Sequence, residues 1–166
     1  MKNKRSAFII VIGVLFITYY ISQNLYQLNL IQGESMYPTY KNLQFTLIDK
    51  RVSDFTCGDV IVFYCPKLNC TMVKRIIAVS GETVLITDGD VLINGTKSPY
   101  INGSVDFGGI ASTALLVSDN FFFVMGDNHA QSKDSRYSEI GCISRKYIIG
   151  RLIPNRPVET IAKPHS

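Results

Sequence analysis

The chain has 166 residues, enough for one domain with a buried core and too few for two. Hydrophobic residues make up 46% of it and charged residues 18%, which excludes a disordered chain, and the excess of valine, isoleucine, tyrosine and phenylalanine over alanine favours strands over helices. The formal net charge is only +4, with no long run of lysine or arginine after the first five residues, so a nucleic-acid partner is not expected. A lipid bilayer is the expected partner of this modest positive charge.

The first predicted element is a transmembrane helix over residues 6–22. This uncharged run follows a basic segment, residues 1–5, and as a helix it reaches roughly 25 Å, near the lower limit for crossing a bilayer. No further positive charge occurs before Lys41, so residues 1–5 are expected to form a cytoplasmic tail, with the rest of the chain outside. The predicted location is therefore the cell membrane, with a single pass.

Two other interpretations of this run are weaker. A cleaved secretory signal needs small residues at its cleavage point, and the chain instead continues as SQNLYQLNLIQG. A buried core helix is the least favoured, because the run is apolar on every face. A retained signal-anchor is the preferred interpretation.

After a polar juxtamembrane linker at residues 23–30, strand and turn signals alternate to the end of the chain. Asp88-Gly89 lies between two short apolar runs and is a strong signal for a two-residue hairpin. No long helical periodicity appears after residue 30, so we expect a mostly β fold, an antiparallel β-sheet domain over residues 31–157, followed by a tail at 158–166. The predicted strands cover residues 43–48, 59–64, 71–79, 83–87, 90–93, 121–125 and 147–153.

The four cysteines, Cys57, Cys65, Cys70 and Cys142, form no Cys-x-x-Cys zinc pattern. In an oxidising compartment disulfides are allowed, and three complete pairings exist. Cys65 and Cys70 could close a tight loop between two strands or remain two reduced thiols, and the sequence favours neither.

Lys74 is a candidate general base. A serine hydroxyl needs a base to become a nucleophile, and a lysine can serve if burial among apolar groups lowers its pKa. Strand alternation places Lys74 on one face with Met72, Ile76 and Ala78. The alternatives are a solvated lysine on an edge strand, and an Asp/His/Ser arrangement through His129.

Ser35 is the candidate nucleophile, in the segment Gly33-Glu-Ser-Met-Tyr-Pro-Thr39. Gly33 permits close approach of a backbone or a substrate, and Pro38 favours a turn. The segment follows the predicted membrane helix, so its serine would lie near the bilayer surface. Without further context, a solvated turn serine is the favoured interpretation of this pattern.

A third polar segment runs from Gly126 to Arg136. Asp127 could pair with Arg75 and Asp134 with Arg136, while Ser132 could bond a neutral lysine amine and orient it. The alternatives are a polar surface loop or a calcium loop, although the regular alternation of EF-hand ligands is missing.

Together these segments resemble the type I signal peptidase (leader peptidase) family. Gly33–Thr39 is similar to its nucleophile box, Gly58–Phe63 to its next strand, Val73–Glu82 to its general-base box and Gly126–Arg136 to its last box. Their order and spacing also agree, and the similarity extends from about Ile31 to Arg156.

The resemblance implies a serine endopeptidase that cuts signal peptides from secreted precursors after small residues at the first and third positions before the cut. Ser35 would attack, its backbone N–H would bind the oxyanion, and Lys74 would act as general base. Ser132 would orient Lys74, and the two ion pairs would brace the site. Neither a cofactor nor a metal is expected. Shallow substrate pockets would be formed by Ile31, Met36, Met72 and Val73.

Two positions depart from the family pattern. Gly33 stands where some members carry a hydroxyl residue that completes the oxyanion hole, and His129 replaces a frequent arginine. Other functions stay open: a dedicated peptidase for a pilin or conjugation protein, and an inactive membrane-anchored module that binds peptides. A self-cleaving repressor would need an N-terminal pair of DNA-binding helices, where this chain has an apolar run.

Overall fold

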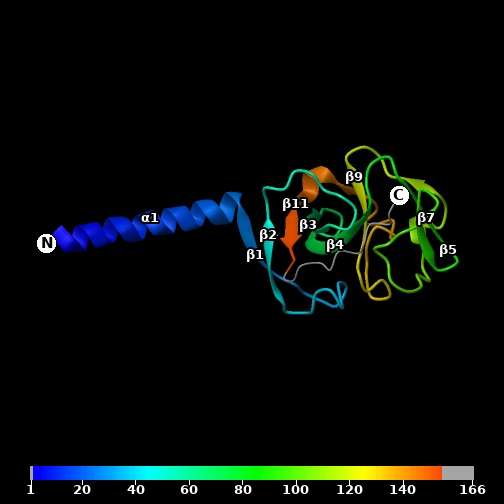
Figure 1. Ribbon diagram of the computed structural model, residues 1–166, viewed down its shortest axis with the longest axis horizontal. Helices are drawn as coiled ribbons and strands as arrows, with labels where there is room; N and C mark the ends of the chain where they lie inside the picture. The colour runs from blue at the N-terminus through cyan, green and yellow to red at the C-terminus, as the bar shows by residue number, and fades with distance from the viewer. Residues whose placement is uncertain (1, 155–166) are drawn as a thin grey trace, which may run out of the picture.

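The described part of the chain forms one long helix that projects from a β domain (Figure 1). The structure is a computed structural model and describes residues 2–154. The helix, α1, spans Lys2–Asn24. The strands are β1 (Tyr26–Leu30), β2 (Phe45–Asp49), β3 (Val60–Cys65), β4 (Cys70–Ala78), β5 (Thr83–Thr87), β6 (Asp90–Ile93), β7 (Thr96–Lys97), β8 (Leu115–Leu116), β9 (Phe121–Met125), β10 (Ile143–Ser144) and β11 (Ile148–Ile153), with short 3-10 helices at Gly109–Ala111 and Arg145–Tyr147.

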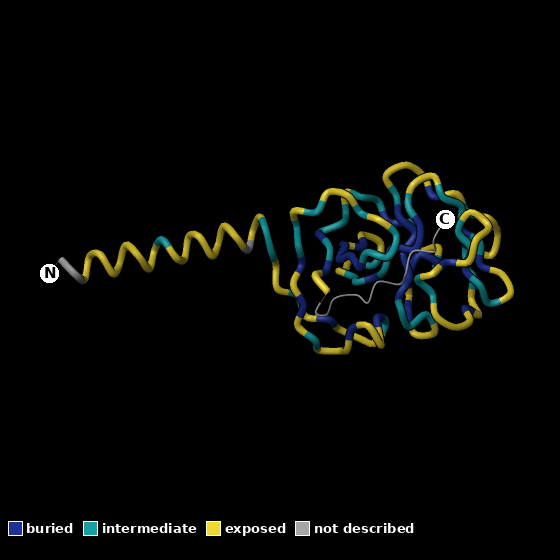
Figure 2. The backbone as a smooth tube through the Cα atoms, viewed as in Figure 1, coloured by how far each residue is buried: buried dark blue, intermediate teal, exposed yellow. Residues whose placement is uncertain are grey.

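Helix α1 has the length and composition of a membrane span. Its window Lys4–Ile21 has a mean hydropathy of 1.6, and none of that window is buried against the rest of the protein. Figure 2 shows almost all of the coloured part of the helix as exposed, while buried residues gather inside the β domain. The predicted span at 6–22 lies within α1, which extends further at both ends because the flanking polar residues continue the helix.

The prediction of a linker at residues 23–30 is wrong. Helix α1 continues to Asn24, and β1 then pairs with β2 in antiparallel register from Tyr26↔Asp49 to Leu30↔Phe45. The strand was missed because its five residues, YQLNL, include no β-branched side chain.

The strands form two sheets, and all their pairings are antiparallel, as predicted. The larger sheet has the order β1-β2-β11-β3-β4-β9-β10, and the smaller has the order β7-β6-β5-β8. Strands β5, β6 and β9 have the predicted bounds, and Asp88 and Gly89 connect β5 to β6 with φ values of 51° and 81°. These values fit the tight hairpin turn that the sequence predicts.

Three groups of buried apolar side chains hold the domain together. One joins β4 and β9 to the smaller sheet through residues such as Ile77, Val84 and Phe123. A second lies on one face of β3 and β4, around Phe63 and Ile76, and a third contains Val62 of β3. Strand β4 therefore lies between well-packed neighbours and is a rigid support for a side chain.

All four cysteines are free thiols in the structure. Cys65 and Cys70 are opposite each other at the end of the β3–β4 hairpin. Of the two states left open by the sequence, the structure has the reduced one. The predicted domain end at residue 157 and the tail at 158–166 lie outside the described residues.

Candidate active site

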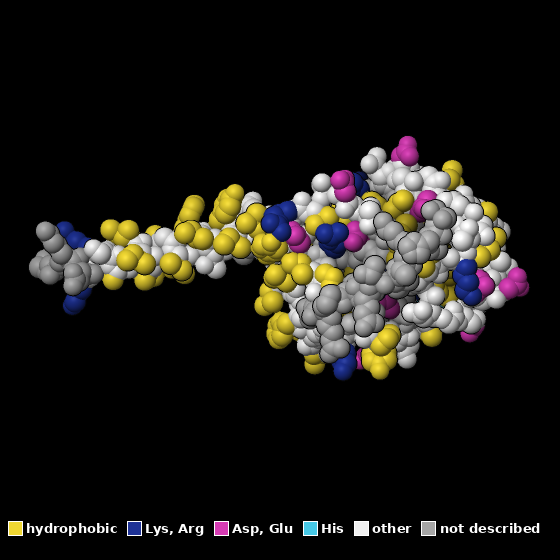
Figure 3. Space-filling model, in the orientation of Figure 1, with side chains coloured by type: hydrophobic (Ala, Val, Ile, Leu, Met, Phe, Trp, Pro, Cys, Tyr) yellow, Lys and Arg dark blue, Asp and Glu magenta, His cyan; other side chains and the backbone are white. Residues whose placement is uncertain are grey.

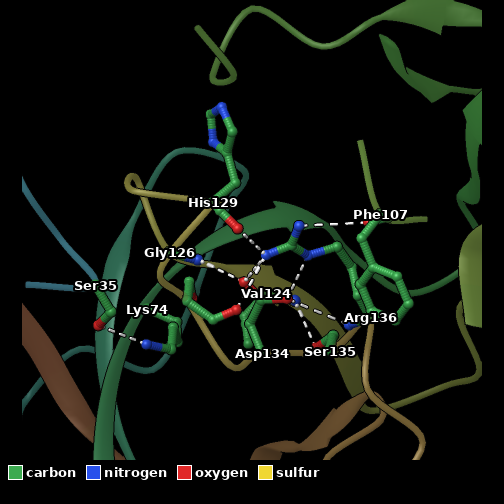
Figure 4. Close-up of polar contacts among 10 residues, drawn as sticks. Ser35, Lys74, Phe107, Val124, Gly126, His129, Asp134, Ser135 and Arg136 are labelled. Carbon is green, nitrogen blue, oxygen red and sulfur yellow. Dashed lines mark hydrogen bonds and ion pairs between the residues drawn. The ribbon is translucent and has the colours of Figure 1, made fainter. Parts of the chain in front are cut away.

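Lys74 is buried in the middle of the larger sheet. It lies on β4 opposite Ile61 of β3, and only 3% of its surface is exposed. Its Nζ is 2.7 Å from Ser35 Oγ, within hydrogen-bond distance (Figure 4). The strand therefore brings a lysine amine and a serine hydroxyl together across 39 residues of sequence.

The surroundings of Lys74 shift the equilibrium of its amine toward the neutral form. Burial lowers the pKa of its amine to about 8, and the nearby Arg136 acts in the same direction, while the charges of Asp134 and Asp127 oppose this shift. At pH 7 this pKa leaves about one amine in ten neutral, against about one in three thousand for an ordinary lysine. A usable fraction of the protein therefore carries a base beside Ser35.

Ser35 lies in a turn that is held by hydrogen bonds from backbone N–H groups. The Tyr37 N–H donates to the Glu34 carbonyl at 3.0 Å, and the Gly33 N–H donates to Asn42 Oδ1 at 2.9 Å. Gly33 has a φ of 88°, a conformation that suits glycine. The turn places the Ser35 side chain against Lys74.

The loop after β9 closes over this turn. The Asn128 N–H donates to the Ser35 carbonyl at 3.0 Å, and Asn128 Nδ2 donates to the Glu34 carbonyl at 3.1 Å. A Cβ on Gly126 would collide with the Ser35 carbonyl oxygen and with the Ser132 side chain. Only glycine therefore fits at position 126, where the loop after β9 passes the Ser35 turn.

Arg75 points to the opposite face of β4 from Lys74 and forms the ion pair with Asp127 expected from the sequence. Its Nε and a terminal nitrogen donate to the two carboxylate oxygens at 2.7 and 2.6 Å, and its other terminal nitrogen donates to the Gly58 carbonyl at 2.8 Å. Thr39 Oγ1 also donates to Asp127. Through these contacts, the pair connects β4 to the loop after β9 and to residues 33–39, the turn that carries Ser35 (the nucleophile turn).

The second expected pair, Asp134–Arg136, is almost inaccessible, with side-chain exposures of 0% and 2%. Arg136 donates to both Asp134 oxygens at 2.8 and 2.9 Å and to the carbonyls of His129 and Ser132 at 2.7 and 3.1 Å. Asp134 also accepts the Gly126 N–H at 3.1 Å. The pair therefore determines the shape of the loop after β9.

Two sequence-based contacts are not formed. Ser132 Oγ is buried and has no hydrogen-bond partner within residues 2–154, so the expected bond to Lys74 is missing. No hydrogen bond joins His129 to Ser35 in the described chain, and Figure 4 shows the imidazole directed away from the Ser35–Lys74 pair. The Asp/His/Ser alternative is therefore wrong for this geometry.

The four predicted pocket residues do not form one cluster. Ile31, Met36 and Val73 pack together, whereas Met72 packs with the group on the other face of β4. Ile31 and Met36 are almost fully buried, with 2% and 1% of their surface exposed. The alternation of residues 72 and 73 along a strand explains the separation.

A cavity of about 1720 Å³ lies next to the Ser35–Lys74 pair (the dyad) without including it. Ser35 and Lys74 are absent from its lining, which contains Tyr40, Arg75, Tyr100, Asp127 and Asn128.

The sequence pattern did not indicate the roles of Asn128 and Thr39, because each acts through a contact that links distant parts of the chain. No group of three His, Cys, Asp or Glu side chains within the described residues could hold a metal ion.

The chain is similar in sequence to the proteins of one known family. The family model described as "Signal peptidase, peptidase S26" matches residues 3–154. The chain is 32% identical over 163 residues to signal peptidase I U of Bacillus subtilis (strain 168), covering 90% of this chain and 87% of that protein. It is 33% identical over 138 residues to signal peptidase I S of the same strain, covering 72% and 71%. A crystal structure of a signal peptidase I from Enterococcus faecalis V583 aligns with a TM-score of 0.48 at 25% identity, over 61% of this chain and 99% of that chain.

Proposed function

Because the chain belongs to the signal peptidase family, peptidase S26, it is a protease of signal-peptide processing, and we propose that it uses Ser35 as nucleophile and Lys74 as general base. The observation that carries this proposal is the 2.7 Å distance between Ser35 Oγ and the buried Lys74 Nζ. The proposed substrates are secreted precursors that carry an N-terminal signal peptide.

The chemistry follows from this pair. Neutral Lys74 takes the Ser35 proton as Oγ attacks the scissile carbonyl, and the resulting ammonium returns the proton to the leaving amine. The acyl group is then bound to Ser35 as an ester. Lys74, neutral again, removes a proton from water, and the attack of that water releases the acid and restores the hydroxyl.

The developing oxyanion needs a hydrogen-bond donor, and the Ser35 N–H is the candidate. Within residues 2–154 this N–H has no hydrogen-bond acceptor, so a substrate oxygen can take that place. The buried Ser132 hydroxyl also has unused bonding capacity close to Gly126. We assign the Arg75–Asp127 and Asp134–Arg136 pairs the role of bracing the loop.

The proposed specificity is for small residues at the first and third positions before the cut. Ile31 and Met36 are buried and Val73 is half-buried, so the apolar group that they form, with Met36 next to Ser35 in the sequence, offers little depth for a side chain. Met72, half-buried on the face of β4 that also carries Lys74, would line a second pocket. Shallow pockets of this kind accept alanine and exclude larger residues.

We also propose that α1 anchors the enzyme in a lipid bilayer, with the N-terminus in the cytoplasm and the β domain outside. The exposed apolar side chains of α1 support insertion, and the basic residues before Ser6 support this orientation. The anchor would hold the dyad near the membrane, where the signal peptide of a precursor is embedded.

A cleavage assay tests the proposed function. Purified Ser35→Ala and Lys74→Ala variants should cleave a precursor with alanine at the first and third positions at least about a thousandfold more slowly than the wild type. Ser118→Ala and Lys97→Ala change exposed residues of the same types and should leave the rate unchanged. Wild-type turnover by either dyad variant would exclude this mechanism.

A further inference from the structure

We propose that the Asn128 side chain is a positioning residue for the oxyanion donor: it holds the Glu34 carbonyl so that the Ser35 N–H of the same peptide group points toward the reacting carbonyl. This inference rests on the proposed function, because it concerns the same reaction. It adds a residue with a defined task, separate from the Ser35–Lys74 proton transfer.

Two hydrogen bonds from Asn128 hold two successive peptide groups of the nucleophile turn. Its side-chain Nδ2 donates to the Glu34 carbonyl at 3.1 Å, and its backbone N–H donates to the Ser35 carbonyl at 3.0 Å. Because the first acceptor is a backbone carbonyl, the side chain must present its amide nitrogen there. The two peptide groups on either side of the Ser35 α-carbon are therefore fixed from one residue.

The geometry of the peptide group makes this contact relevant to catalysis. In a planar trans peptide, the carbonyl and the N–H point in opposite directions. A donor that holds the Glu34 carbonyl therefore also sets the direction of the Ser35 N–H. If this peptide rotated by half a turn, the carbonyl oxygen would face the oxyanion and repel it.

Packing alone does not hold this peptide, because residues 32–34 are exposed. Within the turn, the Tyr37 N–H also donates to the Glu34 carbonyl, at 3.0 Å. The Asn128 contact supplies the second donor and links the turn to the rigid sheet, since the neighbouring Asp127 is bound by Arg75 of β4. A chain of direct contacts thus runs from β4 to the proposed oxyanion donor.

The side-chain contact can be tested without removing the backbone contact. Asn128→Ala deletes the Nδ2 donor, and Asn128→Asp replaces it with an oxygen of nearly the same size that repels the Glu34 carbonyl. We expect kcat to fall about tenfold in the alanine variant, the factor that corresponds to one hydrogen bond of about 1.4 kcal/mol, and to fall further in the aspartate variant. KM should stay within about twofold of the wild type, because the contact acts on the transition state.

Gln131→Ala is the matched control. Gln131 Oε1 accepts from the same Asn128 Nδ2, at 3.4 Å, but Gln131 does not touch the nucleophile turn by a hydrogen bond. This variant should keep kcat within about twofold of the wild type. The pH midpoint of activity should be unchanged in Asn128→Ala, because Asn128 does not contact Lys74.

A transition-state analogue separates this role from simple packing. A peptide aldehyde forms a tetrahedral adduct with Ser35, and its affinity should fall in Asn128→Ala by the same factor as kcat, while the affinity for a non-covalent product peptide stays constant. An aspartate variant more active than the alanine variant, or equal losses of aldehyde and product affinity, would overturn the inference. A wild-type enzyme that cleaves no precursor would instead overturn the proposed function.

Discussion

Lys74 shows how the sheet changes the chemistry of a single residue. On an exposed strand its amine would remain charged, but β3 and β9 flank β4, and the side chain is buried. The cost of burying an ammonium is what lowers its pKa to about 8. The same burial that disfavours the charge therefore favours the neutral amine that the proposed mechanism requires.

This pKa predicts the pH dependence of cleavage. Because only the neutral amine can accept the Ser35 proton, kcat/KM should rise with pH, reach half of its maximum at about pH 8 and level off roughly one unit above. A precursor peptide without titratable side chains should be used over pH 6 to 10.

The variant His129→Gln separates the lysine base from a histidine base. His129 donates no proton toward Ser35, so the variant should keep the midpoint at about pH 8. A flat profile for the wild type, or loss of the alkaline rise in His129→Gln, would contradict the assignment of Lys74.

The Asp134–Arg136 pair is a residue-scale prediction about stability. Replacing Asp134 by Asn leaves a buried guanidinium without its counter-charge, which costs roughly 3–5 kcal/mol of unfolding free energy. Thermal unfolding of the full chain in detergent should show this as a large decrease in Tm. Lys97→Met breaks the exposed Lys97–Asp90 pair and should cost at most about 1 kcal/mol. Equal decreases in Tm for the two variants would show that the buried pair contributes no more to stability than the exposed pair.

At the level of elements, local pattern was sufficient where a strand packs on both sides or ends in a strong turn. The β5–β6 hairpin is an example, because alternation and Asp88-Gly89 determine its bounds. Strand β1 was missed, since its pairing with β2 leaves Leu28 exposed and gives no alternation of buried and exposed apolar residues. Strands β7, β8 and β10 have only two residues each, too few for a sequence pattern.

The site was predictable only in part for the same reason. The resemblance to the family pointed to Ser35 and Lys74, and the structure brings them together. The contact between Asn128 and Glu34 spans 94 residues and depends on how the loop after β9 folds over the turn, so no local pattern could indicate it. Ser132 lacks its expected bond because the loop buries its hydroxyl without orienting it toward Lys74.

At the scale of the whole molecule, the apolar surface of α1 continues onto the β domain. Leu28 is opposite Leu47 and Leu30 is opposite Phe45 across the β1–β2 pair, and all four side chains are partly or largely exposed on one face. Figure 3 shows hydrophobic side chains along α1 and on the adjoining end of the domain. This face lies where a domain held by α1 would meet the bilayer.

Contact of this face with lipid predicts a substrate-dependent defect. The double variant Leu28→Gln/Phe45→Gln should cleave a precursor embedded in vesicles about tenfold more slowly, since it loses roughly 1–2 kcal/mol of apolar burial in lipid, and should cleave a soluble peptide at the wild-type rate. Leu116→Gln is the matched control, because Leu116 on β8 is exposed to 63%, like Phe45, but belongs to the smaller sheet. If Leu116→Gln and the double variant slowed vesicle cleavage equally, or if the double variant slowed the soluble reaction as much, the β1–β2 face would have no specific role at the membrane. A defect confined to the double variant and to embedded substrate would show that the enzyme meets the bilayer with its sheet as well as its helix.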